Sequence, residues 1–170
     1  MPTSKLSAAL PVILALQQAV AGKGSFSMLD VGPGHGKYGL LAREYLHGLE
    51  RLDAIEAESR YLTPVLWEVY DTVQLGDVRD APDSLLDAYD VILMADVIEH
   101  LEKQDGRELL ERISCPVVIT TPSVWFQNPE ADNGWPTERH RSLWGPSDFN
   151  RMTKVQMLAE DVMLVALPGR

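Results

Sequence analysis

The sequence predicts an α/β domain with a doubly wound sheet, that is, a mostly parallel sheet covered by helices on both faces. Short apolar runs typical of buried strands alternate along the chain with segments of helical periodicity, as they do in parallel sheets. The last two predicted strands, 154–158 and 162–167, are separated by only three residues, too few for a crossover. We expect them to form an antiparallel hairpin that gives the sheet an antiparallel edge strand.

Length and composition indicate one soluble domain spanning 1–170. Hydrophobic residues make up 45% of the chain and charged residues 24%, as in globular proteins. No apolar run approaches the roughly 20 residues of a bilayer span, so we expect a cytoplasmic protein without a membrane partner. The net charge of −10 disfavours nucleic acid as a partner, because phosphates are bound through Lys and Arg. A single cysteine, Cys115, excludes an intramolecular disulfide within this sequence.

The chain is organised around FSMLDVGPGHGKYG, residues 26–39. Residues 1–22 precede it as an N-terminal helix, whose regular part should start near Leu10 because Pro11 suits a first turn. An apolar strand then reaches Asp30, glycines at 32, 34 and 36 form a loop, and a helix continues to about Leu46. Glycine lets the backbone approach a ligand closely, and the helix start offers free N–H groups. Nucleotide-like ligands are held this way at the carboxyl ends of parallel strands.

The remaining elements follow in alternation. We expect a second strand ending at Glu56, a third ending at Asp77, and a fourth over 91–95. A fifth strand should span 116–122, and helices should span 63–69, 84–88, 105–113 and 146–152. The 23 residues of 123–145 look irregular and hold three of the four tryptophans.

A carboxylate lies at or near the end of each of the first four strands: Asp30, Glu56, Asp77 and Asp96. Because parallel strands end at one edge of the sheet, these acids should line one crevice. Glu56 lies 20 residues after Gly36, about the spacing at which an acidic residue at the end of a second strand binds a ribose diol. The pattern therefore indicates a site for a nucleoside-containing ligand.

These segments resemble the class I S-adenosylmethionine-dependent methyltransferases. LDVGPGHG resembles their first motif, IEAE their ribose-binding acid, LGDVRD the segment beside adenine, and YDVILMADVIEHL their fourth motif. The four occur in order, and the resemblance covers nearly the whole chain. It implies a Rossmann-like, seven-stranded sheet of strand order 3-2-1-4-5-7-6.

The resemblance also implies S-adenosyl-L-methionine as cofactor, S-adenosyl-L-homocysteine as product, and a methyl acceptor that is a small molecule methylated at oxygen or nitrogen. Such an enzyme, of the EC 2.1.1 type, would be a monomer or homodimer. The implied cofactor-binding residues are Asp30, Gly32, Pro33, Gly34, Gly36, Glu56, Ala57, Asp77, Val78 and Asp96. A nicotinamide-binding domain is the competing interpretation. Its characteristic pattern is GxGxxG, whereas the glycines here are at positions 32, 34, 36 and 39.

Two histidines are candidate catalytic bases. His100 follows the fourth strand, and His140 lies near the end of the irregular segment. Histidine exchanges a proton near neutral pH, and a base is needed where the acceptor must lose a proton. Alternatively, His100 hydrogen-bonds neighbouring loops and His140 is a solvated loop residue.

A metal site is an alternative for the same region, although our main expectation is that no metal is used. DxxEH, followed by TP and by RH before WxxxDF, resembles the metal-dependent small-RNA 3′-end 2′-O-methyltransferases. Carried over by position, the ligands would be Asp96, Glu99, His100 and His140. The sequence departs from that pattern, with Asp for the first Glu and without the paired histidines or the asparagine after TP. A methyltransferase-like binding module without activity is a further alternative.

Aromatic residues concentrate in 123–145, which we interpret as an insertion on the acceptor side. Trp125, Phe126, Trp135 and Trp144 could enclose a planar or cationic acceptor. The alternative is that these side chains pack the insertion onto the sheet.

Overall fold

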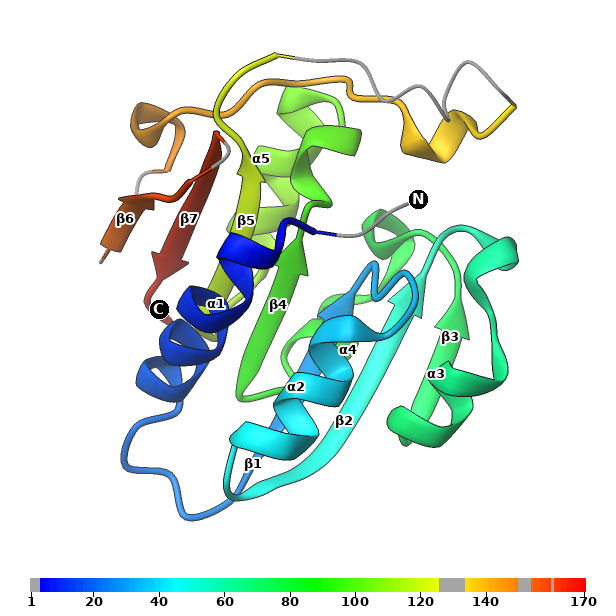
Figure 1. The fold of residues 1–170 in the computed structure, drawn as a ribbon, viewed down its shortest axis with the longest axis vertical. Coiled ribbons are helices and arrows are strands. Elements are labelled where there is room, and N and C mark those ends of the chain that lie inside the picture. Colours follow the sequence, from blue (N-terminus) through cyan, green and yellow to red (C-terminus); the bar gives the residue numbers. More distant parts are fainter. Residues whose placement is uncertain (1–3, 126–133, 150–153, 160) are drawn as a thin grey trace.

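One seven-stranded sheet forms the centre of the computed structural model, which describes residues 4–125, 134–149, 154–159 and 161–170 (Figure 1). Its strands are β1 (Phe26–Val31), β2 (Leu49–Glu56), β3 (Thr72–Leu75), β4 (Val91–Ala95), β5 (Val117–Pro122), β6 (Lys154–Met157) and β7 (Val162–Leu167). They lie in the order β3-β2-β1-β4-β5-β7-β6, which confirms the predicted order.

The terminal hairpin is confirmed, but its antiparallel strand does not lie at the edge. β1 to β5 pair in parallel, whereas β7 is antiparallel to both of its neighbours, β5 and β6. β7 is almost entirely apolar and buried, so an inner position removes more apolar surface from water than an edge position would. The edge is left to β6.

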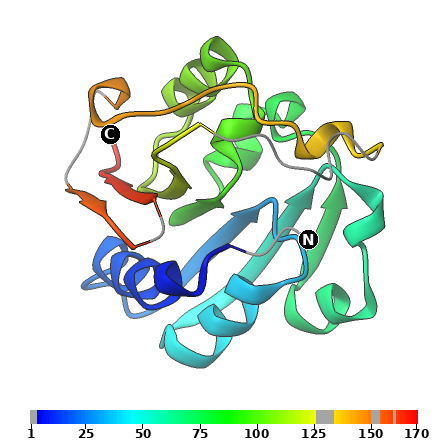
Figure 2. The same cartoon turned by 45° about the horizontal axis from the view of Figure 1, so that its top comes forward.

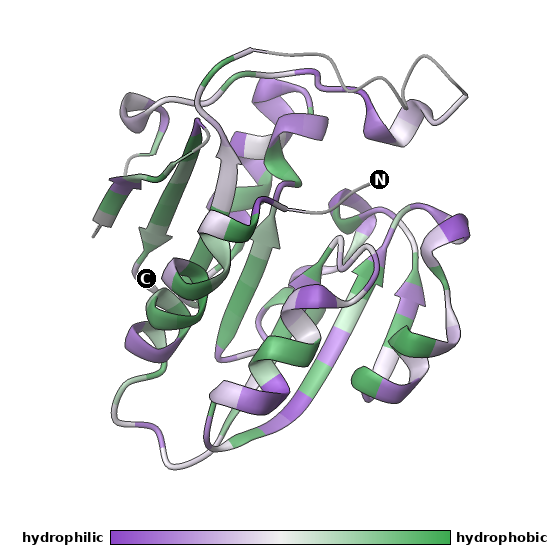
Figure 3. Ribbon diagram, viewed as in Figure 1, coloured by the Kyte–Doolittle hydropathy of each residue, from purple (hydrophilic) through white to green (hydrophobic). Residues whose placement is uncertain are grey.

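Helices cover both faces of the sheet (Figure 2). They are α1 (Leu6–Ala19), α2 (Lys37–Tyr45), α3 (Pro64–Val69), α4 (Asp83–Leu86) and α5 (Lys103–Arg112). Buried side chains of α1, α2 and α3 form one core, and those of α4 and α5 another. Side chains alternate along each strand, so in β4 Leu93 joins the first core while Ile92 and Met94 join the second. β4 and β7 are accordingly hydrophobic along their length (Figure 3).

The helices seen in the described part of the chain all fall short of the length and apolar character that a membrane crossing requires.

Several element boundaries differ from the predicted ones. α1 begins at Leu6 and contains Pro11, because its buried apolar face against the sheet outweighs the loss of one helical N–H donor. β3 ends at Leu75, and Asp77 instead caps a 3₁₀ turn, Val78–Asp80. Of the helix predicted over 146–152, the structure describes a 3₁₀ turn at Pro146–Asp148.

Trp144 anchors the segment 134–149 to the fold. Its indole is 1% exposed, and Nε1–H donates to the Ile98 carbonyl at 3.2 Å and to Ser142 Oγ at 2.8 Å. A Cβ built on Gly106 of α5 would lie 2.6 Å from Trp144 Cζ2, so the helix and the ring are in direct contact. Trp144 is therefore a core residue, and the prediction that it lines a substrate pocket is wrong, because its ring is enclosed by the protein.

Replacing Gly106 by alanine should destabilise the fold. In an open helix this change stabilises by about 1 kcal/mol, but here the added methyl group overpacks Trp144, at a cost of about 1–3 kcal/mol. We expect a net loss of up to about 2 kcal/mol and a melting temperature lower by up to about 8 °C. Gly24→Ala is the control, since nothing lies within 4 Å of a Cβ there. A Gly106→Ala protein as stable as the wild type would contradict the packing described.

Candidate functional site

A cavity of about 770 Å³ lies at the edge where the parallel strands end. Its wall comes from the loop after β1, the end of β2, the turns after β3 and β4, and residues 136–141. The segment that begins at residue 134 crosses this edge at the top of the molecule (Figure 1). A cavity of this size suits a small molecule or cofactor.

The glycine loop after β1 needs glycine for both conformation and space. Gly32, Gly34 and Gly36 have φ values of +67°, +54° and +82°. A Cβ on Gly32 would lie 2.6 Å from Val97 Cγ2, so this loop passes directly against the turn after β4. Pro33 also lines the cavity, whereas Gly36 starts α2 behind the wall.

Glu56 ends β2 with a carboxylate that is held in place and still lines the cavity. The residue is 5% exposed, and its Oε2 accepts the Gly34 N–H at 3.1 Å while Oε1 accepts the Glu58 N–H at 2.8 Å. Burial raises the pKa of Glu56, and the two N–H donors oppose that rise. Each carboxylate oxygen retains acceptor capacity for a ligand hydroxyl.

The turn after β3 provides the neighbouring wall. Ala57, Asp77 and Val78 line the cavity as predicted. The Asp77 carboxylate pairs with Arg79 at 2.6 Å, and these hydrogen bonds hold the pKa of Asp77 below its usual value. Val78 is buried, so this part of the wall combines a paired charge with apolar surface.

Asp30 lies behind the cavity wall and not in it, in contrast to its predicted contact with a cofactor. It is 1% exposed, and the Tyr70 hydroxyl donates to its Oδ2 at 2.6 Å. Burial raises the pKa of Asp30 to about 7. Its side chain thus links β1 to Tyr70, the residue that follows α3.

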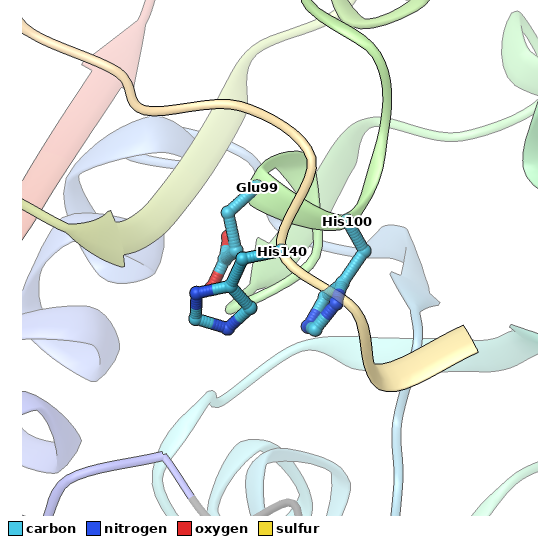
Figure 4. Close-up of side chains that lie close together, drawn as sticks. All are labelled: Glu99, His100 and His140. Carbon is cyan, nitrogen blue, oxygen red and sulfur yellow. The ribbon is translucent and has the colours of Figure 1, made fainter. Parts of the chain in front are cut away.

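At the other end of the cavity, side chains from two distant segments meet (Figure 4). Glu99 and His100 belong to the 3₁₀ turn after β4, and His140 comes from the segment 134–149. The His100 and His140 ring centroids are 4.9 Å apart, and one ligand atom from each of the three residues lies within 4.8 Å of the others. Asp96 lines the cavity but is outside this cluster, and its Oδ1 accepts the Thr120 hydroxyl at 2.9 Å.

Backbone hydrogen bonds fix this arrangement. The Glu99 carbonyl accepts the N–H groups of Arg141 at 2.7 Å and Ser142 at 3.1 Å. His100 Nδ1 lies 3.2 Å from the Arg139 carbonyl, which can only accept, so Nδ1–H is the donor. The two segments are thereby held together although about 40 residues separate them in sequence.

Burial perturbs the protonation equilibria of this cluster. Glu99 is 2% exposed, and neither of its carboxylate oxygens accepts a hydrogen bond of regular geometry from the described residues, although the Thr121 hydroxyl lies near it. Burial raises the pKa of Glu99 well above its ordinary value and lowers that of His100. Both shifts favour the uncharged forms.

The tryptophans predicted to form an aromatic pocket do not line the cavity. Trp125 is 53% exposed, Trp135 packs on the outside against Arg60 and Tyr61, and Phe126 lies outside the described residues. Among the described residues, the wall takes its phenol rings from Tyr38 and Tyr61. In the sequence, the one feature that could have indicated this role is position: Tyr38 closely follows the glycine loop, and Tyr61 closely follows Glu56.

Polar side chains tie the segment 134–149 to the residues after β2 as well. Thr137 Oγ1 donates to Glu58 Oε2 at 3.0 Å, and the Tyr61 hydroxyl donates to Glu138 Oε1 at 2.8 Å. Arg60 lies 3.9 Å from the centre of the Trp135 ring. The segment therefore bridges the cavity from the end of β2 to the end of β4.

Asp30 should make stability depend on pH. Its pKa of about 7 in the fold exceeds the ordinary aspartate pKa of 3.8, so the folded state binds more protons between these values. Stability should fall as the pH rises from about 4 to about 7, by up to roughly 4 kcal/mol from this group. Asp30→Asn should remove that contribution, and Tyr70→Phe should extend the fall to higher pH. Denaturant unfolding across pH tests this, and a pH-independent difference between wild type and Asp30→Asn would contradict it.

Comparison with solved structures identifies proteins of the same fold. No family model matches the sequence, and no curated protein matches it. The magnesium protoporphyrin IX methyltransferase ChlM from Synechocystis PCC 6803, with bound S-adenosylhomocysteine, has a TM-score of 0.66 at 11% identity, over 96% of this chain and 84% of that chain. The N-terminal domain of EvdMO1 with S-adenosylhomocysteine has 0.65 at 17% identity, over 98% and 82%.

A third structure, a Rhodobacter sphaeroides protein provisionally assigned as a Zn-dependent alcohol dehydrogenase, has a TM-score of 0.70 at 12% identity, over 98% of this chain and 92% of that chain. At these identities the comparisons establish the fold. The chain has the Rossmann-like fold of class I methyltransferases, with strand order 3-2-1-4-5-7-6.

Proposed function

We propose that the protein is an S-adenosylmethionine-dependent methyltransferase that acts on oxygen or nitrogen of a small molecule. The observation that carries this proposal is the buried Glu56 carboxylate, hydrogen-bonded to the backbone of the glycine loop and open to the cavity. A fixed acceptor at the end of β2 is what a ribose diol requires. Structures of the same fold hold S-adenosylhomocysteine.

The residues present fit such a donor. Glu56 would accept hydrogen bonds from the ribose hydroxyls, the backbone of Gly32 and Gly34 would lie along the methionine part, and Val78 would contact adenine. When bound, the donor would supply its methyl group to a lone pair of the acceptor, while the electrons of the broken carbon–sulfur bond pass to sulfur. The bridging segment 134–149 would exclude water from this displacement.

The acceptor would lie at the end of the cavity formed by Glu99, His100 and His140. Acceptors that lose a proton during methylation need a group that takes it up, and either imidazole could do so. The cavity volume and the net charge of −10 favour a small neutral or cationic acceptor.

Three alternatives make different predictions. A nicotinamide-dependent dehydrogenase is disfavoured because dinucleotide-binding sheets have the order 3-2-1-4-5-6, whereas here antiparallel β7 lies beside β5. An RNA 2′-O-methyltransferase-like enzyme is disfavoured by the net charge. A binding module without activity would bind the donor and turn over no acceptor in a broad panel.

Thermal unfolding with S-adenosylhomocysteine and, separately, with NAD tests the donor. A ligand at about 100 times its dissociation constant stabilises by roughly 2.7 kcal/mol, which should raise the melting temperature by about 5–11 °C. We expect this shift with S-adenosylhomocysteine. A shift with NAD alone would overturn the proposal.

Glu56→Gln should weaken S-adenosylhomocysteine binding by roughly 10- to 150-fold, since hydrogen bonds to a charged group contribute about 1.5–3 kcal/mol. Glutamine keeps the size and one acceptor oxygen but removes the charge. Glu50→Gln, exposed near the start of the same strand, is the matched control and should leave the affinity unchanged. Titration calorimetry measures both, and equal affinities in all three proteins would disprove the role given to Glu56.

A further inference from the structure

Three metal-ligating side chains converge at the acceptor end of the cavity. Ligand atoms of Glu99, His100 and His140 all lie within 4.8 Å of one another. Two ligands that are each about 2.1 Å from a shared metal ion can be at most about 4.2 Å apart. Small side-chain rotations would therefore bring these atoms to coordination distance. Figure 4 shows the Glu99 carboxylate beside the His140 ring, with the His100 ring across from it.

The environment of the Glu99 carboxylate is the kind that favours a bound cation. Glu99 is 2% exposed and lines the cavity, and neither oxygen accepts a hydrogen bond of regular geometry from the described residues; the Thr121 hydroxyl and the N–H of Glu99 itself are the polar groups near it. Burying a carboxylate without a partner is costly, whereas Glu56, equally buried in the same cavity, receives two N–H donors. A bound cation would provide the missing partner.

His100 is oriented as metal-binding histidines are. Its Nδ1–H donates to the Arg139 carbonyl, which leaves the lone pair of Nε2 available. Metal-ligating histidines typically donate the other ring N–H to a carbonyl or carboxylate in this way.

The backbone holds the ligands together without a cation. The Glu99 carbonyl accepts from Arg141 and Ser142, and the Ser142 hydroxyl donates to the Leu101 carbonyl at 2.8 Å. The hydrogen bonds of the two residues that follow His140 therefore hold it beside the turn after β4, independently of its imidazole ring. Preorganisation of this kind reduces the ordering cost of binding.

The surrounding charges also favour a cation. The carboxylates of Asp96 and Glu138 act on Glu99 electrostatically. Cationic groups lie nearby as well: Lys37 lines the cavity and interacts with Asp96, and Arg141, which pairs with Glu102 at 3.5 Å, acts electrostatically on His100. The carboxylates are the charges that act on Glu99 itself.

We propose that Glu99, His100 and His140 form a binding site for a divalent transition-metal cation. Two imidazoles and one carboxylate suit Zn²⁺, Fe²⁺ or Mn²⁺ better than Mg²⁺ or Ca²⁺, which prefer oxygen ligands. Three protein ligands leave coordination positions open to the cavity. The ligand for those positions would be a neutral acceptor with a hydroxyl oxygen. A metal-bound hydroxyl loses its proton more readily, so the cation would take over the part that an imidazole base plays in the proposed function. That role rests on the proposed methyl transfer, whereas the binding of the cation does not.

Titration calorimetry of the full chain, freed of metal with EDTA, tests the site with Zn²⁺, Mn²⁺ and Mg²⁺ separately. We expect one Zn²⁺ or Mn²⁺ ion per chain and much weaker binding of Mg²⁺. Removing a residue that only hydrogen-bonds to a metal ligand typically weakens metal binding by roughly 10- to 100-fold, and removing a ligand itself should weaken it at least as much. Glu99→Gln and His140→Ala should each therefore weaken binding by on the order of 100-fold or more. His47→Ala, which changes an exposed histidine outside the cavity, should bind as the wild type does.

Two results would overturn the inference: no transition-metal binding by the folded wild-type chain, or undiminished binding by both Glu99→Gln and His140→Ala. Circular dichroism confirms that each variant is folded, and Glu99→Gln keeps the shape of the side chain should His140→Ala fail to fold. S-adenosylhomocysteine is titrated into the same samples. Donor binding without metal binding would refute the metal site alone, and metal binding without donor binding would refute the proposed function alone.

Discussion

The site depends on one constraint, the close parallel alignment of β2, β1 and β4. Parallel strands end at a common edge, so the residues after them are brought together whatever their separation in sequence. The alignment continues past the strands, because the Gly32 N–H donates to the Ile55 carbonyl at 2.8 Å and Gly32 then contacts Val97. A side chain at position 32 would separate the loop after β1 from the turn after β4, and with it the two ends of the cavity.

Two buried glutamates give those ends different chemical characters. Glu56 is surrounded by backbone donors and serves as a fixed acceptor for neutral hydroxyl groups. The Glu99 carboxylate accepts no backbone N–H from another of the described residues, and two imidazoles lie beside it. The same residue type, equally buried in one cavity, is thus suited to an uncharged ligand in one place and to a positive charge in the other. The difference arises from the neighbouring backbone, since the N–H groups of Gly34 and Glu58 donate to the Glu56 carboxylate, whereas the backbone N–H near the Glu99 carboxylate is its own.

Sequence alone predicted much of the fold and one end of the site. The glycine loop, Glu56 and the terminal hairpin are encoded in short local patterns, and their positions follow from the sheet. Local patterns do not tell which way an aromatic side chain faces. The sequence therefore predicts a pocket position for Trp144, although its ring packs against Gly106, almost 40 residues earlier in the chain. Asp30 illustrates the same difficulty, because its partner Tyr70 lies on another element. His100 and His140 are brought together in the sequence only by the resemblance to metal-dependent enzymes, because their contact depends on backbone hydrogen bonds between distant segments.

The bridging segment 134–149 is attached by two different kinds of contact. Near β2 it is held by polar and charged groups, including Arg60, which stacks on Trp135 and is partly exposed to solvent. Near β4 it is held by backbone hydrogen bonds and by the enclosed Trp144 ring. Dissolved salt screens exposed charges and leaves buried apolar contacts intact. Concentrated salt should therefore weaken the exposed Arg60 contacts beside Glu56, whereas the buried hydrogen bond from Tyr61 to Glu138 and the Trp144 end keep the segment attached.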